Sequence, residues 1–359
     1  MLKRNRIAGA LLLGALIQAG AMAPALAAPI AASVSTGLFH DALAPYGDWV
    51  PTERLGPVWA PARVEHGWRP YAKGRWVVTE AGWTWAGTEA WSWATDHYGR
   101  WAYEPAYGWV WVPGVEWGAA WVSWRHGGGY VGWAPLAPGV SITGGPVKLE
   151  ANPDPFAFTF VPDRFLAEAN LERHLVPPVH NVTCLRVTNN VTTYAIAENH
   201  LVNRGVEVER IEKEAGRPVP RFRLREADTV EASGRANERG AEVAFFHPRA
   251  GQAAPAVKPA RSSRPPDRTI EDLRRDHERE ARELQEAEAR ERRELVKEQD
   301  GEERHAPSDQ SVDELRQRHE SELKAQDAHA RREQEMLEAR QRRERGAVAE
   351  AAGGSAPRH

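Results

Sequence analysis

Cysteine is almost missing from this sequence: Cys184 is the only one among 359 residues. No disulfide can form within the chain, so its stability must come from burial even in an oxidising compartment. Long apolar runs are missing after the first residues, and we expect no later segment to cross a bilayer, which takes about 20 apolar residues. The sequence also has no excess of positive charge, since it contains 47 Lys and Arg residues and 50 Asp and Glu residues. This balance argues against a nucleic-acid partner.

Signatures of catalysis are also absent. The sequence has no Gly-x-Ser-x-Gly nucleophile elbow, no phosphate-binding loop that ends in Gly-Lys-Ser/Thr and no His-Glu-x-x-His zinc helix. His180 and Cys184 stand close together in the sequence, but a thiol nucleophile also needs a lowered pKa and an orienting group, which nothing nearby supplies. We therefore predict that the protein is not an enzyme and has no cofactor and no metal site.

Four carboxylates near predicted turns deserve a separate test, because a glycosidase needs two of them at a defined separation. They are Glu80, Glu89, Glu104 and Glu116. Exposed carboxylates are ordinary in turns, so we interpret all four as solvated loop residues. A glycan-directed hydrolase with Glu104 or Glu116 as the acid stays the alternative.

The N-terminus has the pattern of an export signal. Lys3, Arg4 and Arg6 precede a short apolar run, and Ala25-Leu26-Ala27 has the small-x-small pattern of a cleavage site. We predict a signal peptide at 1–27 and no transmembrane span after its cleavage. The expected location is the periplasm, the cell envelope or the exterior of a bacterium.

Tryptophan is abundant, and all 15 tryptophans lie between Trp49 and Trp133. Their spacing reveals an internal repeat, which indicates one supersecondary unit copied along the chain. One column of the repeat is Gly56, Gly82 and Gly108, each followed at the same distance by Trp59, Trp85 and Trp111. A second column is the Gly-x-Trp motif of residues 47–49, 74–76 and 99–101.

Each repeat unit is predicted to be a β-hairpin. In the second unit, residues 75–79 are β-branched and aromatic, residues 80–82 are turn-like, and Trp83-Thr84-Trp85 alternates with period two. We expect residues 40–139 to form a mainly β domain of about eight short strands, arranged as an antiparallel meander or a small barrel of hairpins.

Most of the tryptophans are expected in the core, because each one buries about 150–250 Å². Strict alternation would still leave some rings at the surface, where rings beside arginines stack sugars or grip cationic groups. The candidate binding surface consists of Trp76, Trp85, Trp101, Trp109, Trp111, Arg75 and Arg100.

The rest of the chain differs in composition. Residues 140–250 are rich in Asn, Val and Thr and are predicted to form irregular short strands, including 181–197, with one short helix at 165–175. Residues 251–268 are a Pro/Ala-rich linker. Residues 269–345 are predicted to form two charged helices, either solvated or paired as a coiled coil with themselves or with a partner. Residues 346–359 are expected to be a disordered tail.

The stretch 98–136 carries the motifs Gly-Arg-Trp, Tyr-Gly-Trp-Val-Trp-Val-Pro and Gly-Trp-Ala-Pro-Leu. These motifs resemble the tryptophan-rich exported bacterial proteins of domain-of-unknown-function family 6600, over roughly residues 40–139. The resemblance implies export and a repeat fold, and it implies no known activity, so no functional residue is carried over.

These observations lead to one expectation and two alternatives. We expect an exported, non-enzymatic envelope or periplasmic protein that acts as a scaffold or binding module, with a cell-wall glycan or an envelope protein as partner. The alternatives are a glycan-directed hydrolase or carbohydrate-binding module that uses exposed tryptophans, and a structural protein that self-associates through residues 269–345.

Overall fold

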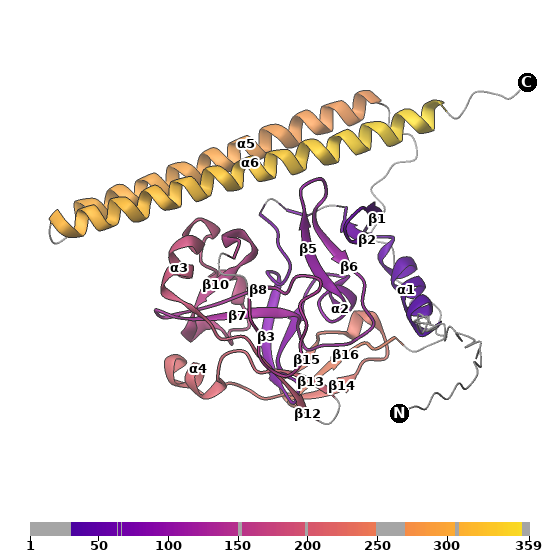
Figure 1. The fold of residues 1–359 in the computed structure, drawn as a ribbon, viewed down its shortest axis with the longest axis horizontal. Helices are drawn as coiled ribbons and strands as arrows, with labels where there is room; N and C mark the ends of the chain where they lie inside the picture. Colours follow the sequence, from indigo (N-terminus) through magenta and orange to yellow (C-terminus); the bar gives the residue numbers. More distant parts are fainter. Residues whose placement is uncertain are drawn as a thin grey trace, which may run out of the picture.

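The computed structural model describes residues 30–62, 64–65, 67–149, 153–197, 200–248, 270–305 and 309–353. Within these ranges the chain forms a β-rich body, across which a long two-helix arm lies (Figure 1). The predicted signal peptide and the predicted linker at 251–268 lie outside the described residues, as does the end of the predicted tail.

The tryptophan repeat forms four β-hairpins, and each hairpin places one tryptophan directly opposite another. The cross-strand pairs are Trp49–Trp59, Trp76–Trp85, Trp101–Trp111 and Trp124–Trp133. The strands are β1 (Gly47–Thr52) and β2 (Gly56–Pro61), β3 (Gly74–Thr79) and β4 (Gly82–Gly87), β5 (Arg100–Glu104) and β6 (Gly108–Val112), and β7 (Val122–Gly127) and β8 (Tyr130–Pro135). The repeat therefore encodes a facing pair of indoles, which cross-strand contact stabilises.

The two glycine columns of the repeat have different physical causes. Gly56, Gly82 and Gly108 end the hairpin turns with φ of 72°, 82° and 75°, a backbone conformation that favours glycine. The glycine of each Gly-x-Trp motif instead lies against the indole of the facing strand. A Cβ added to Gly47 would lie 2.6 Å from Trp59 Cε2, and one added to Gly74 would lie 2.8 Å from Trp85 Cζ2.

The hairpins associate two by two and do not follow one another as a meander. The first and third share one sheet of order β1-β2-β6-β5, in which Trp59 pairs with Trp111. The second and fourth lie in different sheets but meet through their tryptophans, since the rings of Trp76 and Trp124 have centroids 4.5 Å apart. The predicted meander of residues 40–139 is therefore wrong, although the predicted number of strands agrees with the structure.

Strands from residues 140–250 complete the sheets of the repeat. Strand β8 pairs with β10, β7 pairs with β11, and the β3–β4 hairpin continues through β13 and β12 to β9. A separate sheet has the order β14-β16-β15. The bounds are β9 (Gly145–Pro146), β10 (Thr159–Pro162), β11 (Asn189–Asn190), β12 (Thr193–Ala197), β13 (His200–Asn203), β14 (Arg223–Glu226), β15 (Ala236–Asn237) and β16 (Glu242–Phe245).

Short helices fill the spaces between the sheets. Helix α1 packs Leu38, Phe39 and Leu43 into the tryptophan core, a contribution that the sequence analysis missed. The helices are α1 (Ile30–Leu43), α2 (Ser92–Thr95), α3 (Asn181–Val187) and α4 (Val208–Ala215), with 3₁₀ turns η1 (Pro155–Ala157), η2 (Asp163–Phe165), η3 (Leu171–His174), η4 (Pro178–His180) and η5 (Val230–Ala232).

Two local predictions for this region are wrong. Residues 181–187 form helix α3 and no strand, because tertiary contacts outweigh their β-branched composition. Asn181 donates from Nδ2 to the Pro155 and Phe158 carbonyls at 2.9 and 2.8 Å, and Cys184 packs against Phe158 and Phe160. The predicted single helix at 165–175 is replaced by turns η2 and η3.

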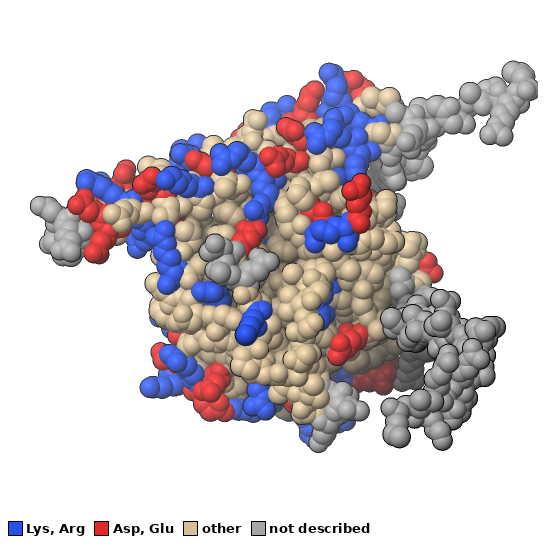
Figure 2. All heavy atoms as spheres, viewed as in Figure 1, with Lys and Arg blue, Asp and Glu red and all other residues tan. Residues whose placement is uncertain are grey.

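The arm consists of α5 (Ile270–Arg304) and α6 (Asp309–Gly353), two paired antiparallel helices. The ion pairs between them show this orientation, because the residue numbers rise along α5 while those of the partners fall along α6. The pairs are His277–Glu344, Glu280–Arg340, Arg292–Asp327 and Glu302–Arg318. Helix α6 continues past residue 345 into the predicted tail. Charged side chains of both signs mix along the arm, as Figure 2 shows. None of the described helices combines the length and hydropathy that a membrane span requires.

Candidate functional site

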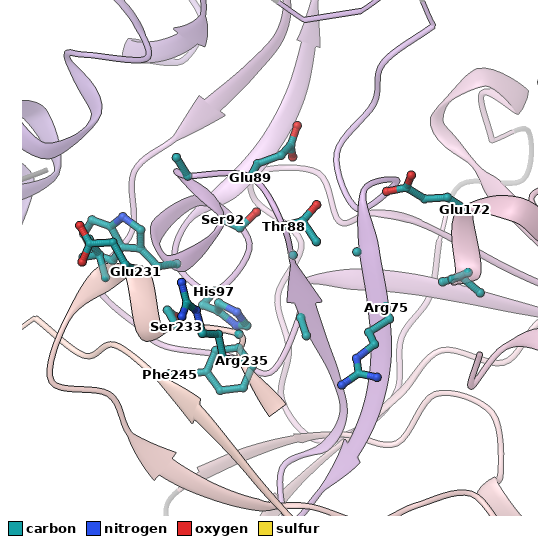
Figure 3. Close-up of a pocket in the computed structure, with 18 of the residues that line it drawn as sticks. Arg75, Thr88, Glu89, Ser92, His97, Glu172, Glu231, Ser233, Arg235 and Phe245 are labelled. Carbon is teal, nitrogen blue, oxygen red and sulfur yellow. The ribbon is translucent and has the colours of Figure 1, made fainter. Parts of the chain in front are cut away.

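A cleft of about 760 Å³ opens where three segments outside the hairpin cores meet (Figure 3). The first segment leads from the end of β4 through α2 to His97. The second is 169–173, around η3, and the third is 230–235 together with Phe245. Three carboxylates and three guanidinium groups line the cleft: Glu89, Glu172, Glu231, Arg75, Arg173 and Arg235.

Glu89 is the most perturbed carboxylate of the cleft. It accepts a hydrogen bond from Trp68 Nε1 at 2.5 Å. Burial raises the pKa of Glu89 to about 7, while the Trp68 bond and the charge of Lys73 oppose that rise. The negative charges of Glu172 and Glu65 raise it further. Glu89 can therefore donate or accept a proton near neutral pH.

Asp96 lies beneath the cleft and is only 2% exposed. Burial, followed by the charge of Glu89, holds its pKa well above the ordinary range, although the side chains of Ser92, Thr95 and Trp85 lower it. Gly87 makes room for this group, because a Cβ there would lie 2.5 Å from Asp96 Oδ2. Asp96 is thus a buried carboxyl that stays neutral, and the nearby charge of Glu89 favours that neutral form.

His97 forms part of the cleft wall. Its Nδ1 lies 2.9 Å from the Gly118 carbonyl oxygen, and its ring stacks on Trp117 with centroids 5.5 Å apart. Burial lowers the pKa of His97 to about 4, so the imidazole is neutral at physiological pH. Because Nδ1 then donates to the carbonyl, His97 fixes the wall and carries no charge to a ligand.

Most of the predicted aromatic surface lies in the interior of the body. Trp76, Trp85, Trp101 and Trp111 are each at most 2% exposed, so they offer no face for stacking a ligand. Trp109 is half-buried beside Tyr103. The strict alternation that suggested exposed rings fails because both faces of the hairpins are covered.

The two predicted arginines separate. Arg100 is half-buried and lies over the Trp121 ring, with Cζ 3.4 Å from the ring centroid. Arg75 lines the cleft and forms an ion pair with Glu238 at 3.1 Å. Arg75 is therefore the one residue of the predicted surface that belongs to the cleft.

The carboxylates of the hydrolase alternative also separate. Glu104 forms an ion pair with Arg54 at 2.5 Å, and Glu116 is exposed. Glu80 accepts the backbone N–H of Leu224. Of these four carboxylates, only Glu89 lines the cleft. Its position in the sequence, two residues after Gly87, does not indicate a cleft.

His180 and Cys184 do not form a catalytic pair. His180 faces Glu322 and Glu298 of the arm. Cys184 is 3% exposed, and burial raises the pKa of its thiol to about 12, which makes it unreactive. Over the described part of the chain, no three His, Cys, Asp or Glu side chains are grouped in a way that could hold a metal ion.

Paired-tryptophan hairpins and a charged arm define the class of this protein as a tryptophan-repeat β protein with a helical extension. Residues 40–140 match the model of a family of unknown function (DUF6600). The resemblance seen in the motifs is thereby confirmed. A comparison with curated proteins found no similar protein, and a comparison with solved structures found no similar fold.

Proposed function

We propose that the protein is an exported, non-enzymatic binding module of the bacterial envelope or periplasm. In this proposal the paired tryptophans form a rigid scaffold, the cleft binds the ligand, and the arm acts as a spacer or partner-binding element. The signal-like N-terminus supports export, and the location of the tryptophans in the core supports a scaffold role.

The cleft is the observation that carries this proposal. Its carboxylates and arginines are balanced in number, which favours a ligand without a large net charge. Thr88, Asn170 and Ser233 supply groups that both donate and accept hydrogen bonds, while the rings of Tyr46, Trp93 and Phe245 are nearly buried in the wall. A glycan segment, which carries many hydroxyl groups, fits this polar lining best.

Calorimetry of the full chain tests this proposal, with soluble peptidoglycan fragments, a neutral polysaccharide and choline as titrants. We expect heat on glycan addition, and we expect Glu89→Gln and Arg235→Ala to weaken binding by about 1–3 kcal/mol each. Glu80→Gln is the matched control, because Glu80 lies outside the cleft and the amide can still accept from Leu224. Unchanged affinity in both cleft variants, or binding of choline alone, would contradict the proposal.

A second candidate function, hydrolysis of a glycan, draws support from the raised pKa of Glu89. A general acid needs a pKa near the working pH, and Glu89 meets that condition. We propose Glu89 as the acid in this alternative, in place of Glu104 or Glu116. Release of new reducing ends, lost in Glu89→Gln and kept in Glu104→Gln, would support it. Binding without turnover would leave the non-enzymatic function in place.

A further inference from the structure

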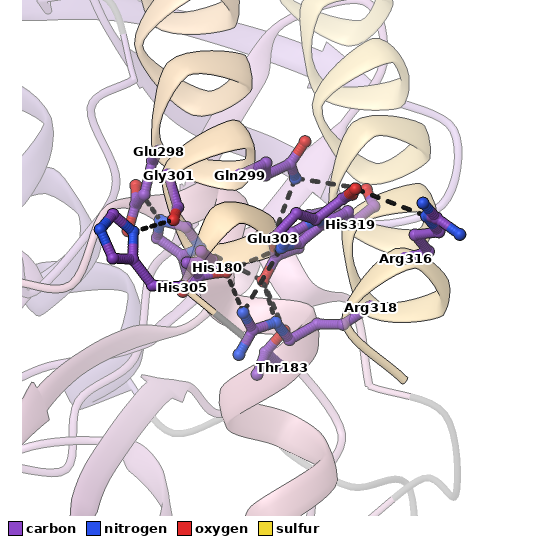
Figure 4. Close-up of polar contacts among 12 residues, drawn as sticks. His180, Thr183, Glu298, Gln299, Gly301, Glu303, His305, Arg316, Arg318 and His319 are labelled. Carbon is purple, nitrogen blue, oxygen red and sulfur yellow. Dashed lines mark hydrogen bonds and ion pairs between the residues drawn. The ribbon is translucent and has the colours of Figure 1, made fainter. Parts of the chain in front are cut away.

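The arm meets the body at a cluster of four carboxylates, two histidines and two arginines (Figure 4). Helix α5 contributes Glu298, Glu302 and Glu303, and α6 contributes Arg316, Arg318, His319 and Glu322. The body contributes His180, from the end of η4. The cluster lies where α5 and α6 approach their connection, next to α3.

Glu322 is the centre of this contact. Its side chain is 3% exposed, yet it receives groups from both sides of the interface. Thr183 Oγ1 of the body donates to it at 2.7 Å, and Gln299 Nε2 of α5 donates at 3.2 Å. His180 Nδ1 lies 3.3 Å away and Arg318 Nε lies 4.0 Å away. A buried, ionised carboxylate in these surroundings is stable only when positive charge lies nearby.

Both histidines present both ring nitrogens to carboxylates. His180 places Nδ1 near Glu322 and Nε2 3.4 Å from Glu298. His319 places Nε2 2.7 Å from Glu302 and Nδ1 3.3 Å from Glu303, and its side chain is 5% exposed. A neutral imidazole has one N–H, so it would turn a lone pair toward one of its two carboxylates. Only the protonated ring donates on both sides.

The charges of the cluster lead to the same conclusion. Four carboxylates face two arginines, so the cluster has an excess of negative charge when both imidazoles are neutral. Protonating the His180 ring reduces this excess next to Glu298 and Glu322. Two nearby groups do not change this charge balance directly. Arg186 donates to Ser321 at 2.8 Å, and the buried Cys184 thiol stays protonated and uncharged.

We infer that His180 is a proton-operated clasp, which holds the arm on the body when its ring is charged and loosens it when the ring is neutral. The attachment of the arm to the body therefore depends on pH. His319 bridges α5 and α6 within the arm. Other contacts of α6 with the body lie outside this cluster, including the ion pair of Arg332 with Asp154 at 2.6 Å. His329 stacks on Phe156 and faces Glu333 of its own helix at 3.5 Å.

The direction of the pH response follows from the partners of His180. The hydrogen bond to Glu322 raises the pKa of His180 above its ordinary value; burial opposes this, and the charges of Glu322 and Glu298 add to it. A raised histidine pKa gives stability that is present below about pH 6.5 and is lost as pH rises through the folded value. The same contacts lower the pKa of Glu322 to about 2, against burial, so its contribution is lost only in strong acid.

Hydrogen–deuterium exchange of the full chain tests the clasp, at about pH 5.5 and about pH 8.5, on either side of the ordinary histidine value. After correction for intrinsic rates, amides of residues 315–326 should exchange faster at the higher pH, by roughly tenfold for each pKa unit of the shift. Amides of β7 and β8 should show no such change. Equal protection of the arm at both pH values would overturn the inference.

Variants separate the clasp from general stability. His180→Gln should remove the pH response and should exchange at about pH 5.5 as fast as the unchanged chain does at about pH 8.5. His40→Gln is the control, because His40 is exposed, lies on α1 and is not part of the cluster. If His180→Gln keeps the full pH response, other groups operate the arm and the inference is wrong. If its arm stays as protected at both pH values as that of the unchanged chain at about pH 5.5, His180 does not hold the arm.

Discussion

At the residue scale, the repeat is best understood through its glycines. A Gly-x-Trp motif places a glycine where the indole of the opposite strand must lie, so the motif is a packing requirement and not only a turn signal. Trp59 fills the space over Gly47, and its Nε1 donates to the Leu43 carbonyl at 3.1 Å. The short motif therefore specifies the partner strand as well as its own.

Replacing Gly47 by alanine tests this packing requirement. Gly47→Ala should destabilise the protein by about 1–3 kcal/mol, since the new methyl group meets Trp59 and the Ala60 carbonyl oxygen. Gly37→Ala in α1 is the control, because a Cβ there has no atom within 4 Å. Urea unfolding measures both. A Gly47→Ala protein as stable as the control would contradict the packing argument.

Glu89 provides a second residue-scale prediction, this time of pH dependence. Its raised pKa means that the charged form is less stable in the folded protein than in the unfolded chain. Stability should therefore fall as pH rises from about 4.5 through 7, and Glu89→Gln should remove that loss. We expect Glu89→Gln to be more stable than the unchanged chain by about 1–3 kcal/mol at about pH 8, and equal to it at about pH 4. Chemical unfolding at both pH values measures the difference.

At the element scale, the β5–β6 hairpin contains two unequal tryptophans. In the β5–β6 hairpin, Trp111 Nε1 donates to the Tyr98 carbonyl at 2.6 Å. The facing Trp101 Nε1 has no acceptor within the described parts of the chain. Both rings are buried, so the two positions differ mainly in this hydrogen bond.

Phenylalanine substitutions in this hairpin measure that difference. Trp111→Phe should be more destabilising than Trp101→Phe by about 1–2 kcal/mol, because it also leaves the Tyr98 carbonyl unpaired. Thermal or urea unfolding of the two variants gives the comparison. Equal losses would mean that ring volume alone decides the stability of the hairpin.

At the scale of the whole molecule, the body and the arm meet through a polar interface. Helix α6 contacts the body at His180 and Thr183, then at Asp154 and Phe156, and finally at the β5–β6 turn, where Arg343 lies 4.3 Å over the Tyr107 ring. Interfaces of this kind permit movement of one part against another more readily than an apolar core does. This agrees with an arm whose attachment depends on charge.

Self-association through the arm remains a proposal, and sedimentation tests it. Helices α5 and α6 pair with each other within one chain, so we expect the full protein to sediment with the mass of a monomer at micromolar concentration. A chain that ends at residue 250 is the comparison. A dimer mass for the full chain, and a monomer mass for the shortened one, would favour the oligomerising alternative.

The sequence alone determined the local units of this protein. The repeat spacing located the first three hairpins, and the carboxylate- and arginine-rich composition located both long helices, because hairpin turns and helix starts depend on neighbouring residues. Motifs of a few residues also predicted the match of residues 40–140 to a family of unknown function.

Only the tertiary structure decided which units meet. Trp76 meets Trp124, Glu89 enters a cleft formed with residues 169–173 and 230–235, and His180 meets Glu322 of the arm. These partners are far apart in the sequence, and no local pattern marks them. Burial and charge at such meetings arise from neighbours across space, which is why the exposed rings were predicted wrongly and the histidine clasp was not predicted at all.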